Sequence, residues 1–489
     1  MTARPILAAA VSAVWTLAAA PFPEKGGTLR FNGGNSPKSY NAYVDNNSYT
    51  MMTFSMMYET LLDSDPDTLD FEPAIASGWE ASGSRFVFSI DERARWSDGE
   101  PVTARDVKWT FDAIMNPGND TGPWKTILGG FESPSVDGEL KIEFRKAESG
   151  GRDWRDLMTL GTFPVLPAHA FEGKDFSKLR LVGAPVSGPY SLARVEPEIE
   201  CELRREGGWW RADSPRCRDF FNFDRIIMRY FAESQNAFEA FKDRKIDVFP
   251  VYTARIMARE TGGEAFAKNW IVKRRFRNHA PVGFQGFAMN MRRKPFDDLR
   301  VRRAMAKLLD REKLNSTLMF NEYFLLSSYY QDIWDDQHEC PNERFSFDPA
   351  GARALLEEAG LGNGFSFTFL SRSSMEDKFL APFSEALAKL GVKMEIVRKD
   401  FAGWMRDMDE FNYDMTWASW GAGVFKQPES MWLSSDADRR GSNNITGFKS
   451  AEVDRLIALE KTMDTMAERV EAYRKIDELV AAEVPYILL

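Results

Sequence analysis

The residues that most often perform catalysis are scarce in this chain. It has three histidines and three cysteines among 489 residues. His338 lies in the run 335–340 (Asp-Asp-Gln-His-Glu-Cys), whose side chains could bind a metal, but the spacing fits no standard metal site. Residues 360–364 (Gly-Leu-Gly-Asn-Gly) look like a phosphate loop, yet they follow a predicted helix, whereas phosphate-binding loops precede one. We therefore predict neither a catalytic centre nor a cofactor.

A group of aromatic residues points instead to ligand binding. Four aromatic residues flank three small ones: Trp417, Trp420, Phe425 and Trp432 around Gly421, Ala422 and Gly423. Indole rings beside small residues can build an apolar pocket with exposed backbone amides. The same spacing also suits ordinary core packing, and the sequence leaves both interpretations open.

The composition excludes two classes of protein. Hydrophobic residues make up 44% of the chain and aromatic residues 13%, which is more apolar material than a disordered chain carries. The formal net charge is −10, whereas a nucleic-acid-binding protein needs a basic surface. A chain of 489 residues is also too long for one hydrophobic core, so we expect two or three domains.

The first 20 residues have the layout of a secretory signal peptide. A basic start, Met1–Arg4, precedes an apolar run at 6–20 that is too short to span a membrane stably. No cysteine occurs before Cys201, so none is available for a lipid anchor, and no later stretch is apolar enough to cross a bilayer. We predict cleavage near residue 20 and export to the periplasm without a membrane anchor.

The cysteines allow one disulfide at most. Cys201 and Cys217 are close in sequence, and an oxidising compartment would permit a bond between them. The sequence leaves this bond and two free thiols as equal alternatives, and it predicts that Cys340 is unpaired.

Residues 85–107 show most clearly how the chain should fold locally. Phe86, Phe88 and Ile90 alternate with smaller or polar residues, the period-two pattern of a strand. Thr103 and Asp106 have the spacing of a capping box before a helix. Further along, strands predicted at 365–370, 392–397 and 413–420 alternate with helices, which is typical of an α/β lobe. The order of elements favours two α/β lobes, the first with an insert.

The region 85–107 also resembles the signature of the family 5 extracellular solute-binding proteins. Further motifs of that family follow in order: Pro73–Trp79, Pro167–His169, Gly188–Leu192, Ala237–Phe241, Phe347–Pro349 and Glu358–Gly360. Residues 286–296, 428–429 and 441–447 most resemble the branch that contains microcin C-type peptide receptors. The resemblance implies a two-lobed periplasmic-binding-protein fold that closes over its ligand by a hinge motion. It divides the chain into a first-lobe core (21–57 and 180–288), an accessory subdomain of that lobe (58–179) and a second lobe (289–489).

This resemblance implies a substrate-binding protein of an ABC importer, which captures oligopeptides or modified peptides and delivers them to an inner-membrane permease. We expect it to act as a monomer. A receptor of the same fold for a glycoside, an opine or a metal complex is the nearest alternative. A secreted hydrolase and a periplasmic chaperone are more distant alternatives.

The resemblance also implies a ligand site. Its candidate residues are Trp420, Gly421, Ala422 and Gly423, with Trp417, Asn290, Arg292 and Asn444 as weaker candidates for the lining. Many relatives have a carboxylate at the place of Gly423 that holds the amino terminus of the peptide. Its absence predicts that ligands with blocked amino termini are tolerated. Relatives usually continue past the position of 484–489 with elements that return to the first lobe, so the resemblance implies that such a segment is missing here.

Overall fold

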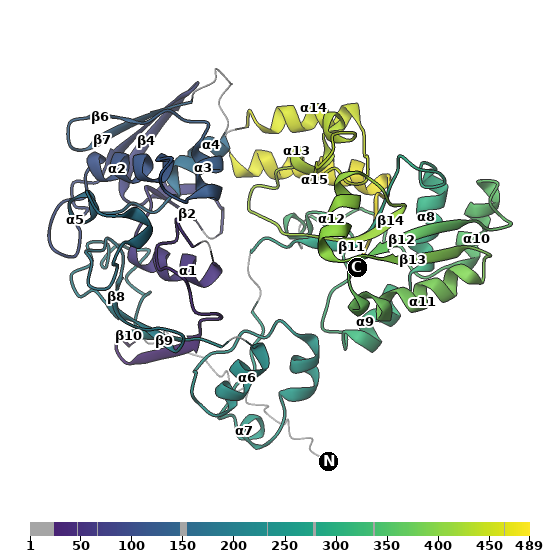
Figure 1. Ribbon diagram of the computed structural model, residues 1–489, viewed down its shortest axis with the longest axis horizontal. Helices are drawn as coiled ribbons and strands as arrows, with labels where there is room; N and C mark the ends of the chain where they lie inside the picture. The colour runs from purple at the N-terminus through teal and green to yellow at the C-terminus, as the bar shows by residue number, and fades with distance from the viewer. Residues whose placement is uncertain are drawn as a thin grey trace, which may run out of the picture.

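The computed structural model describes residues 24–45, 47–65, 67–146, 154–231, 233–276, 280–335, 338–463 and 465–489. The predicted signal peptide, residues 1–20, lies outside the described residues. The elements up to α7 (Glu264–Ala267) form one lobe, and those from β11 (Phe284–Met289) onwards form a second lobe beside it (Figure 1). Within the described residues, no helix has both the length and the apolar composition needed to span a membrane.

The described residues of the first lobe form two four-stranded sheets and one two-stranded sheet. One sheet has the order β1-β10-β9-β8, in which β1 and β10 are parallel, and another has the order β4-β5-β7-β6. The bounds are β1 (Thr28–Asn32), β2 (Leu62–Ser64), β3 (Phe71–Pro73), β4 (Ala76–Ser82), β5 (Arg85–Ile90), β6 (Ser135–Asp137), β7 (Lys141–Arg145), β8 (Tyr190–Glu196), β9 (Glu200–Arg205) and β10 (Arg225–Arg229). The predicted strand at 85–90 is therefore confirmed, and it places Phe86, Phe88 and Ile90 in the core.

Helices pack around these sheets. Their bounds are α1 (Ser48–Met57), α2 (Ala104–Met115), α3 (Gly122–Leu128), α4 (Trp154–Gly161), α5 (Ala168–Phe171), α6 (Ser234–Lys242) and α7, with short helical turns η1 (Phe176–Lys178) and η2 (Ile256–Glu260). The predicted capping box of α2 is confirmed, because the Thr103 N–H donates to the Asp106 carboxylate at 2.8 Å. A bridge between Phe31 and Val248 joins the chain after α6 to β1.

The second lobe is a five-stranded sheet covered by helices on both faces. The strand order is β13-β12-β14-β11-β15, and β12 is parallel to both β13 and β14. The strands after β11 are β12 (Ser366–Ser371), β13 (Lys393–Arg398), β14 (Met415–Trp420) and β15 (Tyr486–Leu488). The helices are α8 (Leu299–Leu308), α9 (Arg311–Leu318), η3 (Gln331–Ile333), α10 (Pro349–Glu358), η4 (Ser374–Glu376), α11 (Asp377–Ala388), α12 (Phe401–Asp409), α13 (Glu429–Trp432), η5 (Ser434–Asp436), α14 (Ala451–Glu460) and α15 (Met466–Ala482).

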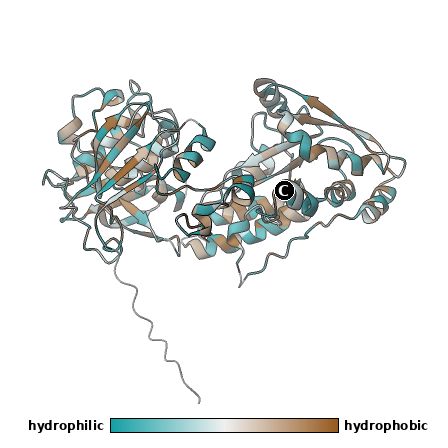
Figure 2. Ribbon diagram, turned by 90° about the horizontal axis from the view of Figure 1, so that it is seen from below, coloured by the Kyte–Doolittle hydropathy of each residue, from teal (hydrophilic) through white to brown (hydrophobic). Residues whose placement is uncertain are grey.

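The buried hydrophobic residues form three cores, and the core of the first lobe also includes Phe425 and Met466 from the second lobe. In the first lobe, one continuous core includes residues of α1, of the sheet around β5 and of the sheet around β9, such as Phe54, Phe88 and Leu203. In the second lobe, two cores lie on opposite faces of the sheet: Trp417 belongs to one, and Ala418 to the other. Apolar residues accordingly concentrate in the strands inside the lobes (Figure 2).

The structure does not form the disulfide that the sequence permitted. Cys201, Cys217 and Cys340 are all free, buried thiols. Cys201 lies on β9 in the core of the first lobe, where its thiol interacts with the hydroxyl groups of Tyr40 and Tyr230. Closeness in sequence did not produce a bond, because the strand directs Cys201 into the core while Cys217 lies in a separate turn.

A buried carboxyl group at the end of α1 predicts pH-dependent stability. Glu59 accepts hydrogen bonds from Trp210 Nε1 at 2.7 Å and from Arg211 at 3.0 Å. Burial nevertheless raises the pKa of Glu59 from 4.5 to about 7, and Arg211 only partly opposes this shift. The folded state therefore holds this proton more tightly than the unfolded chain does, and stability falls as pH rises from about 4.5 to about 7.

We expect Glu59→Gln to remove up to about 3 kcal/mol of this pH dependence. Urea unfolding of both proteins at pH 5 and pH 8 measures it. Equal pH dependence of the free energy of unfolding in the two proteins would contradict the role given to Glu59.

Candidate functional site

One edge of the second-lobe sheet gathers the ends of three strands. Because β12 is parallel to β13 and to β14, their carboxyl ends lie at the same edge. Such edges are the usual ligand-binding places of open α/β sheets. The end of β14 brings Trp420 to this edge, and Gly421, Ala422 and Gly423 follow it as an exposed loop.

Trp420 is half-buried and held at a defined position. It pairs with Phe284 at the start of β11, and its indole Nε1–H donates to the Tyr486 hydroxyl at 3.1 Å. Tyr486 lies on β15 and is itself buried. The indole is thus held by the second lobe while part of its surface remains accessible.

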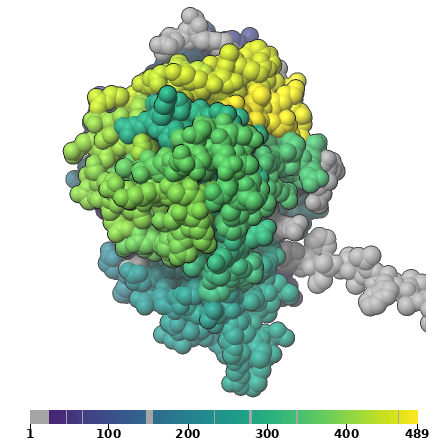
Figure 3. Space-filling view, turned by 90° about the vertical axis from the view of Figure 1, so that its right-hand side faces the viewer, coloured from purple at the N-terminus to yellow at the C-terminus, as the bar shows by residue number. Residues whose placement is uncertain are grey.

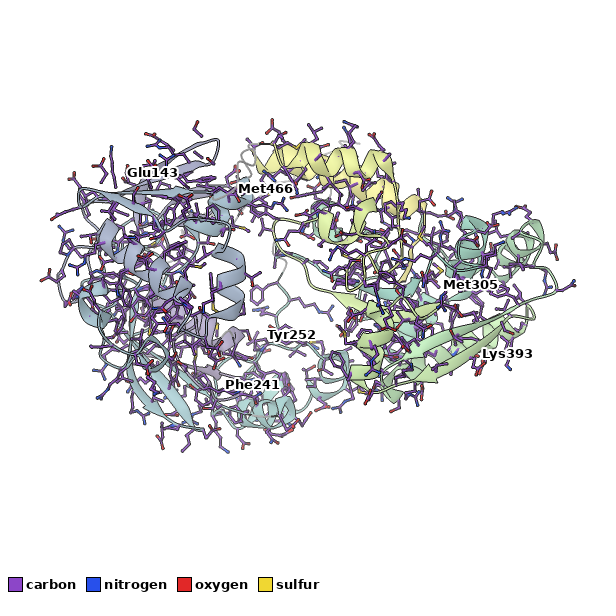
Figure 4. All side chains as sticks on the ribbon, turned by 45° about the horizontal axis from the view of Figure 1, so that its top comes forward. Glu143, Phe241, Tyr252, Met305, Lys393 and Met466 are labelled. Carbon is purple, nitrogen blue, oxygen red and sulfur yellow. The ribbon has the colours of Figure 1, made fainter. Side chains whose placement is uncertain are left out.

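The chain after Gly423 makes contact with the first lobe. The ring of Phe425 stacks on Phe71 of β3, with 6.3 Å between the ring centroids and 22° between the planes. Glu429 at the start of α13 forms an ion pair with Arg155 of α4. Figure 1 shows the loop after β14 extending towards the first lobe. Figure 4 shows Met466, the first residue of α15, at the end of that helix that faces the first lobe. The segment that follows the candidate ligand loop is therefore also a contact between the lobes.

A buried ion pair lies directly behind this loop. The Lys426 ammonium pairs with the Asp332 carboxylate, and the two side chains are 2% and 13% exposed. The ammonium also donates to the Gly423 carbonyl oxygen at 3.1 Å. Burial lowers the pKa of Lys426, and the Asp332 carboxylate opposes this shift.

A cavity of about 750 Å³ lies between the lobes beside these residues. Its lining includes Asp67–Asp70 from the turn between β2 and β3 in the first lobe. From the second lobe it includes Asp332, Val424, Lys426 and the first turns of α15. This volume is in the range of small-ligand pockets. In the view onto the second lobe, the C-terminal helices lie at the top of the molecule and the chain around α6 and α7 lies at the bottom (Figure 3).

The structure keeps Trp420, Gly421, Ala422 and Gly423 together at the sheet edge but places Trp417 differently. Trp417 lies on the opposite face of β14 from Trp420, because odd and even positions of a strand face opposite ways. It is only 9% exposed and packs against Phe287 and Phe379. Core packing, one of the two interpretations of the aromatic group, describes Trp417.

The other three candidates lie at the opposite end of the β11–β14 pair. Asn290 donates from its side chain to the carbonyl oxygens of Phe411 and Tyr413 at 3.0 and 2.9 Å. Arg292 donates to the carbonyl oxygen of Ile445 at 2.8 Å, and its guanidinium carbon lies 3.7 Å from the Phe411 ring centroid.

Asn444 is fully buried and bridges backbone groups in the same region. Its side chain donates to the Leu433 and Phe448 carbonyl oxygens at 3.0 and 2.9 Å. β14 runs from Met415 at this end to Trp420, a distance of about 17 Å at the usual rise per residue. The structure therefore does not bring Asn290, Arg292 and Asn444 to the edge that holds Trp420.

Sequence reasoning missed the polar groups next to the loop. Lys426 and Asp332 are 94 residues apart, and Arg155 and Glu429 are 274 residues apart. No local pattern signals either pair, since each depends on where the tertiary fold places two distant segments. Within the described residues, no group of three or more His, Cys, Asp or Glu side chains could hold a metal ion.

Comparisons with known proteins agree with this architecture. Residues 70–442 match the model of the bacterial extracellular solute-binding proteins, family 5. The peptidoglycan-binding protein YepA of Agrobacterium fabrum is 26% identical over 483 residues, covering 88% of this chain and 78% of YepA. YejA of the same organism, named as a probable peptide-binding protein, is 25% identical over 515 residues, covering 94% of this chain and 83% of YejA.

The fold is also similar to solved structures. The unliganded open form of MppA, named as a periplasmic murein tripeptide binding protein, has a TM-score of 0.78 at 18% identity. The alignment covers 95% of this chain and 91% of MppA. Because the family model matches more than half of the chain, the predicted two-lobed fold and the family are both confirmed. The chain belongs to the bacterial extracellular solute-binding proteins of family 5.

Proposed function

We propose that the protein is the periplasmic receptor of an ABC importer and captures oligopeptides or modified peptides between its two lobes. The observation that carries this proposal is the chain from Trp420 to Glu429. It presents an exposed loop at the carboxyl edge of the sheet, and it then contacts the first lobe through Phe425 and Glu429. A ligand on this loop would lie next to the segment that contacts the first lobe. It would drive closure if it bound the closed arrangement of the lobes better than the open one.

The names of relatives favour a peptide as the ligand. YepA is named for peptidoglycan, YejA for peptides and MppA for a murein tripeptide. Peptides and cell-wall peptides are therefore the first ligands to test. The likeness to microcin C-type receptors stays a prediction.

The cellular setting follows from the same proposal. The signal-peptide pattern of residues 1–20 predicts export to the periplasm. There the closed, loaded protein would dock on an inner-membrane permease, and no turnover of the ligand is expected. We also propose that the first lobe consists of a core and an accessory subdomain (58–179), and that the protein is a monomer. The second lobe begins at β11, at Phe284, which lies before the predicted boundary at residue 289, because β11 is a strand of the second-lobe sheet.

Native mass spectrometry of the protein, purified gently from its own periplasm, tests this function. We expect adducts with the masses of short peptides that are released on denaturation. The matched control is the same protein after unfolding, dialysis and refolding, which should be free of adducts and should regain them from a synthetic tetrapeptide pool. A refolded protein that binds no peptide would contradict the proposal, and adducts with glycoside, opine or metal-complex masses would favour the alternative receptors.

A further inference from the structure

A buried arginine of the second lobe carries its positive charge without a paired carboxylate. Arg311 is the first residue of α9 and is 9% exposed. Its Nη1 atom donates to the carbonyl oxygens of Leu326 and Leu488 at 2.7 and 3.0 Å. Within the described residues, no Asp or Glu carboxylate forms an ion pair with it, and its Nε and Nη2 atoms donate to no protein acceptor. Because arginine keeps its charge in proteins, this side chain is a buried cation that lacks an anion.

The unused edge of the Arg311 guanidinium has the geometry that binds a carboxylate. The Nε and Nη2 atoms lie side by side on one edge of the planar group, where a carboxylate can accept two parallel hydrogen bonds. Burial lowers the pKa of Arg311, and the Glu312 carboxylate opposes this shift. Burial therefore costs this charge free energy, which a bound anion would recover.

Arg311 lines a cavity of about 440 Å³, which we call the second-lobe cavity. The cavity lies between the start of α9, the segment 324–331 and the segment 344–347 that leads into α10. Its lining shares no residue with the cavity between the lobes and does not include residues 420–423. It is therefore separate from the candidate ligand site, and its volume suits a small organic molecule.

The rest of the lining combines a second cation with aromatic rings. Arg344 is exposed at this cavity, and no carboxylate pairs with it in the part of the chain that the structure describes. The rings of Phe324 and Phe347 are 62% and 44% exposed, so a ligand that covered them would remove apolar surface from water. Glu312 also lines the cavity, but the two arginines outnumber this carboxylate.

The other carboxylates near Arg311 have partners of their own. Asp310 precedes it in sequence and accepts the Lys313 N–H at 2.9 Å as the cap of α9. Glu343 lines a smaller cavity together with Arg311, and it forms an ion pair with Arg303 at 3.9 Å. Neither carboxylate occupies the free edge of the guanidinium.

We propose that the second-lobe cavity is a further binding site, for a small organic molecule that joins a carboxylate to an apolar body. Arg311 holds the carboxylate through its Nε and Nη2 atoms, and Arg344 adds a second positive charge. Phe324 and Phe347 cover the apolar body. The site does not depend on the peptide-receptor function, because its lining is separate from the candidate ligand site.

Two carboxylates and their amides test this site: phenylacetate with phenylacetamide, and hexanoate with hexanamide. Isothermal titration calorimetry of the refolded protein measures the Kd of each probe. We expect each carboxylate to bind at one site and its amide to bind at least about tenfold more weakly, because the amide cannot form a charge-assisted bidentate pair with Arg311. Carboxylate binding should be unchanged in Trp420→Ala, which alters only the candidate ligand site.

Two substitutions with opposite expected effects place the carboxylate in the cavity. Arg344→Gln should weaken carboxylate binding about fivefold, and Glu312→Gln should strengthen it about fivefold by removing a like charge. Arg353→Gln, at an exposed arginine of α10 outside the cavity, is the matched control and should change little. Arg311 itself is kept, because its Nη1 hydrogen bonds support the backbone. Thermal melting checks that all variants fold.

Several results would overturn the inference. Equal binding of carboxylates and amides would exclude the pairing with Arg311, and the absence of saturable binding would exclude the site. Carboxylate affinities that stay unchanged in both Arg344→Gln and Glu312→Gln would place the probes elsewhere. Loss of carboxylate binding in Trp420→Ala would place them in the candidate ligand site instead.

Discussion

Arg469→Met is expected to lower the free energy of unfolding by about 3–5 kcal/mol. Arg469 of α15 and Glu460 of α14 form an ion pair in which both side chains are fully buried. Glu460 also accepts a hydrogen bond from the Tyr473 hydroxyl at 2.6 Å, and Arg469 donates to the Met463 carbonyl oxygen at 2.8 Å. Removing the arginine would leave a buried carboxylate without its cation, which costs far more than the net value of the pair itself.

Urea unfolding measures this loss, and two further variants control it. Arg455→Met removes an arginine that pairs with Glu452 on the exposed side of α14, and it should leave the unfolding midpoint nearly unchanged. The double variant Glu460→Leu with Arg469→Met should recover most of the stability, because no unpaired charge remains. Equal losses from Arg455→Met and Arg469→Met would contradict the importance of burial for this pair.

Trp420→Ala is expected to weaken ligand binding about 100-fold, or by about 2.7 kcal/mol, while the protein stays folded. Aromatic side chains at the centre of a binding site commonly contribute this much. Trp420 is half-buried at the sheet edge, so its truncation should remove a ligand contact without opening a large cavity in a core. Titration of the refolded protein with the synthetic tetrapeptide pool measures the loss of affinity, and thermal melting checks that the variant is folded.

Two control variants distinguish the contact between the Trp420 indole and the ligand from the hydrogen bond that holds the indole and from core packing. Tyr486→Phe removes only the hydroxyl that accepts the Trp420 N–H, and it should reduce affinity much less than Trp420→Ala does. Trp417→Ala should instead destabilise the second lobe by about 3–5 kcal/mol, because that ring is buried between Phe287 and Phe379. Unchanged affinity in Trp420→Ala, or its failure to fold, would contradict the role of this residue in binding.

Local sequence patterns predicted much of the fold because their physical causes are local. The alternation of Phe86, Phe88 and Ile90 produced β5, and the spacing of Thr103 and Asp106 produced the start of α2. The predicted strand at 413–420 begins two residues later in the structure, at Met415. Family motifs spread along the chain added the two-lobed architecture, which the comparisons confirmed.

The candidate site could be predicted only in part, since its residues come from segments far apart in the chain. The sequence by itself determined that Trp420, Gly421, Ala422 and Gly423 lie together, because consecutive residues at the end of one strand cannot be separated. Only the tertiary structure decided that Trp417 enters a core and that Asn290, Arg292 and Asn444 bind backbone groups at the other end of the same strands.

The tertiary structure also decided that Lys426 meets Asp332 and that Phe425 meets Phe71. Each of these contacts joins residues that are far apart in sequence. They depend on how whole sheets and lobes pack, and no local propensity or spacing contains that information.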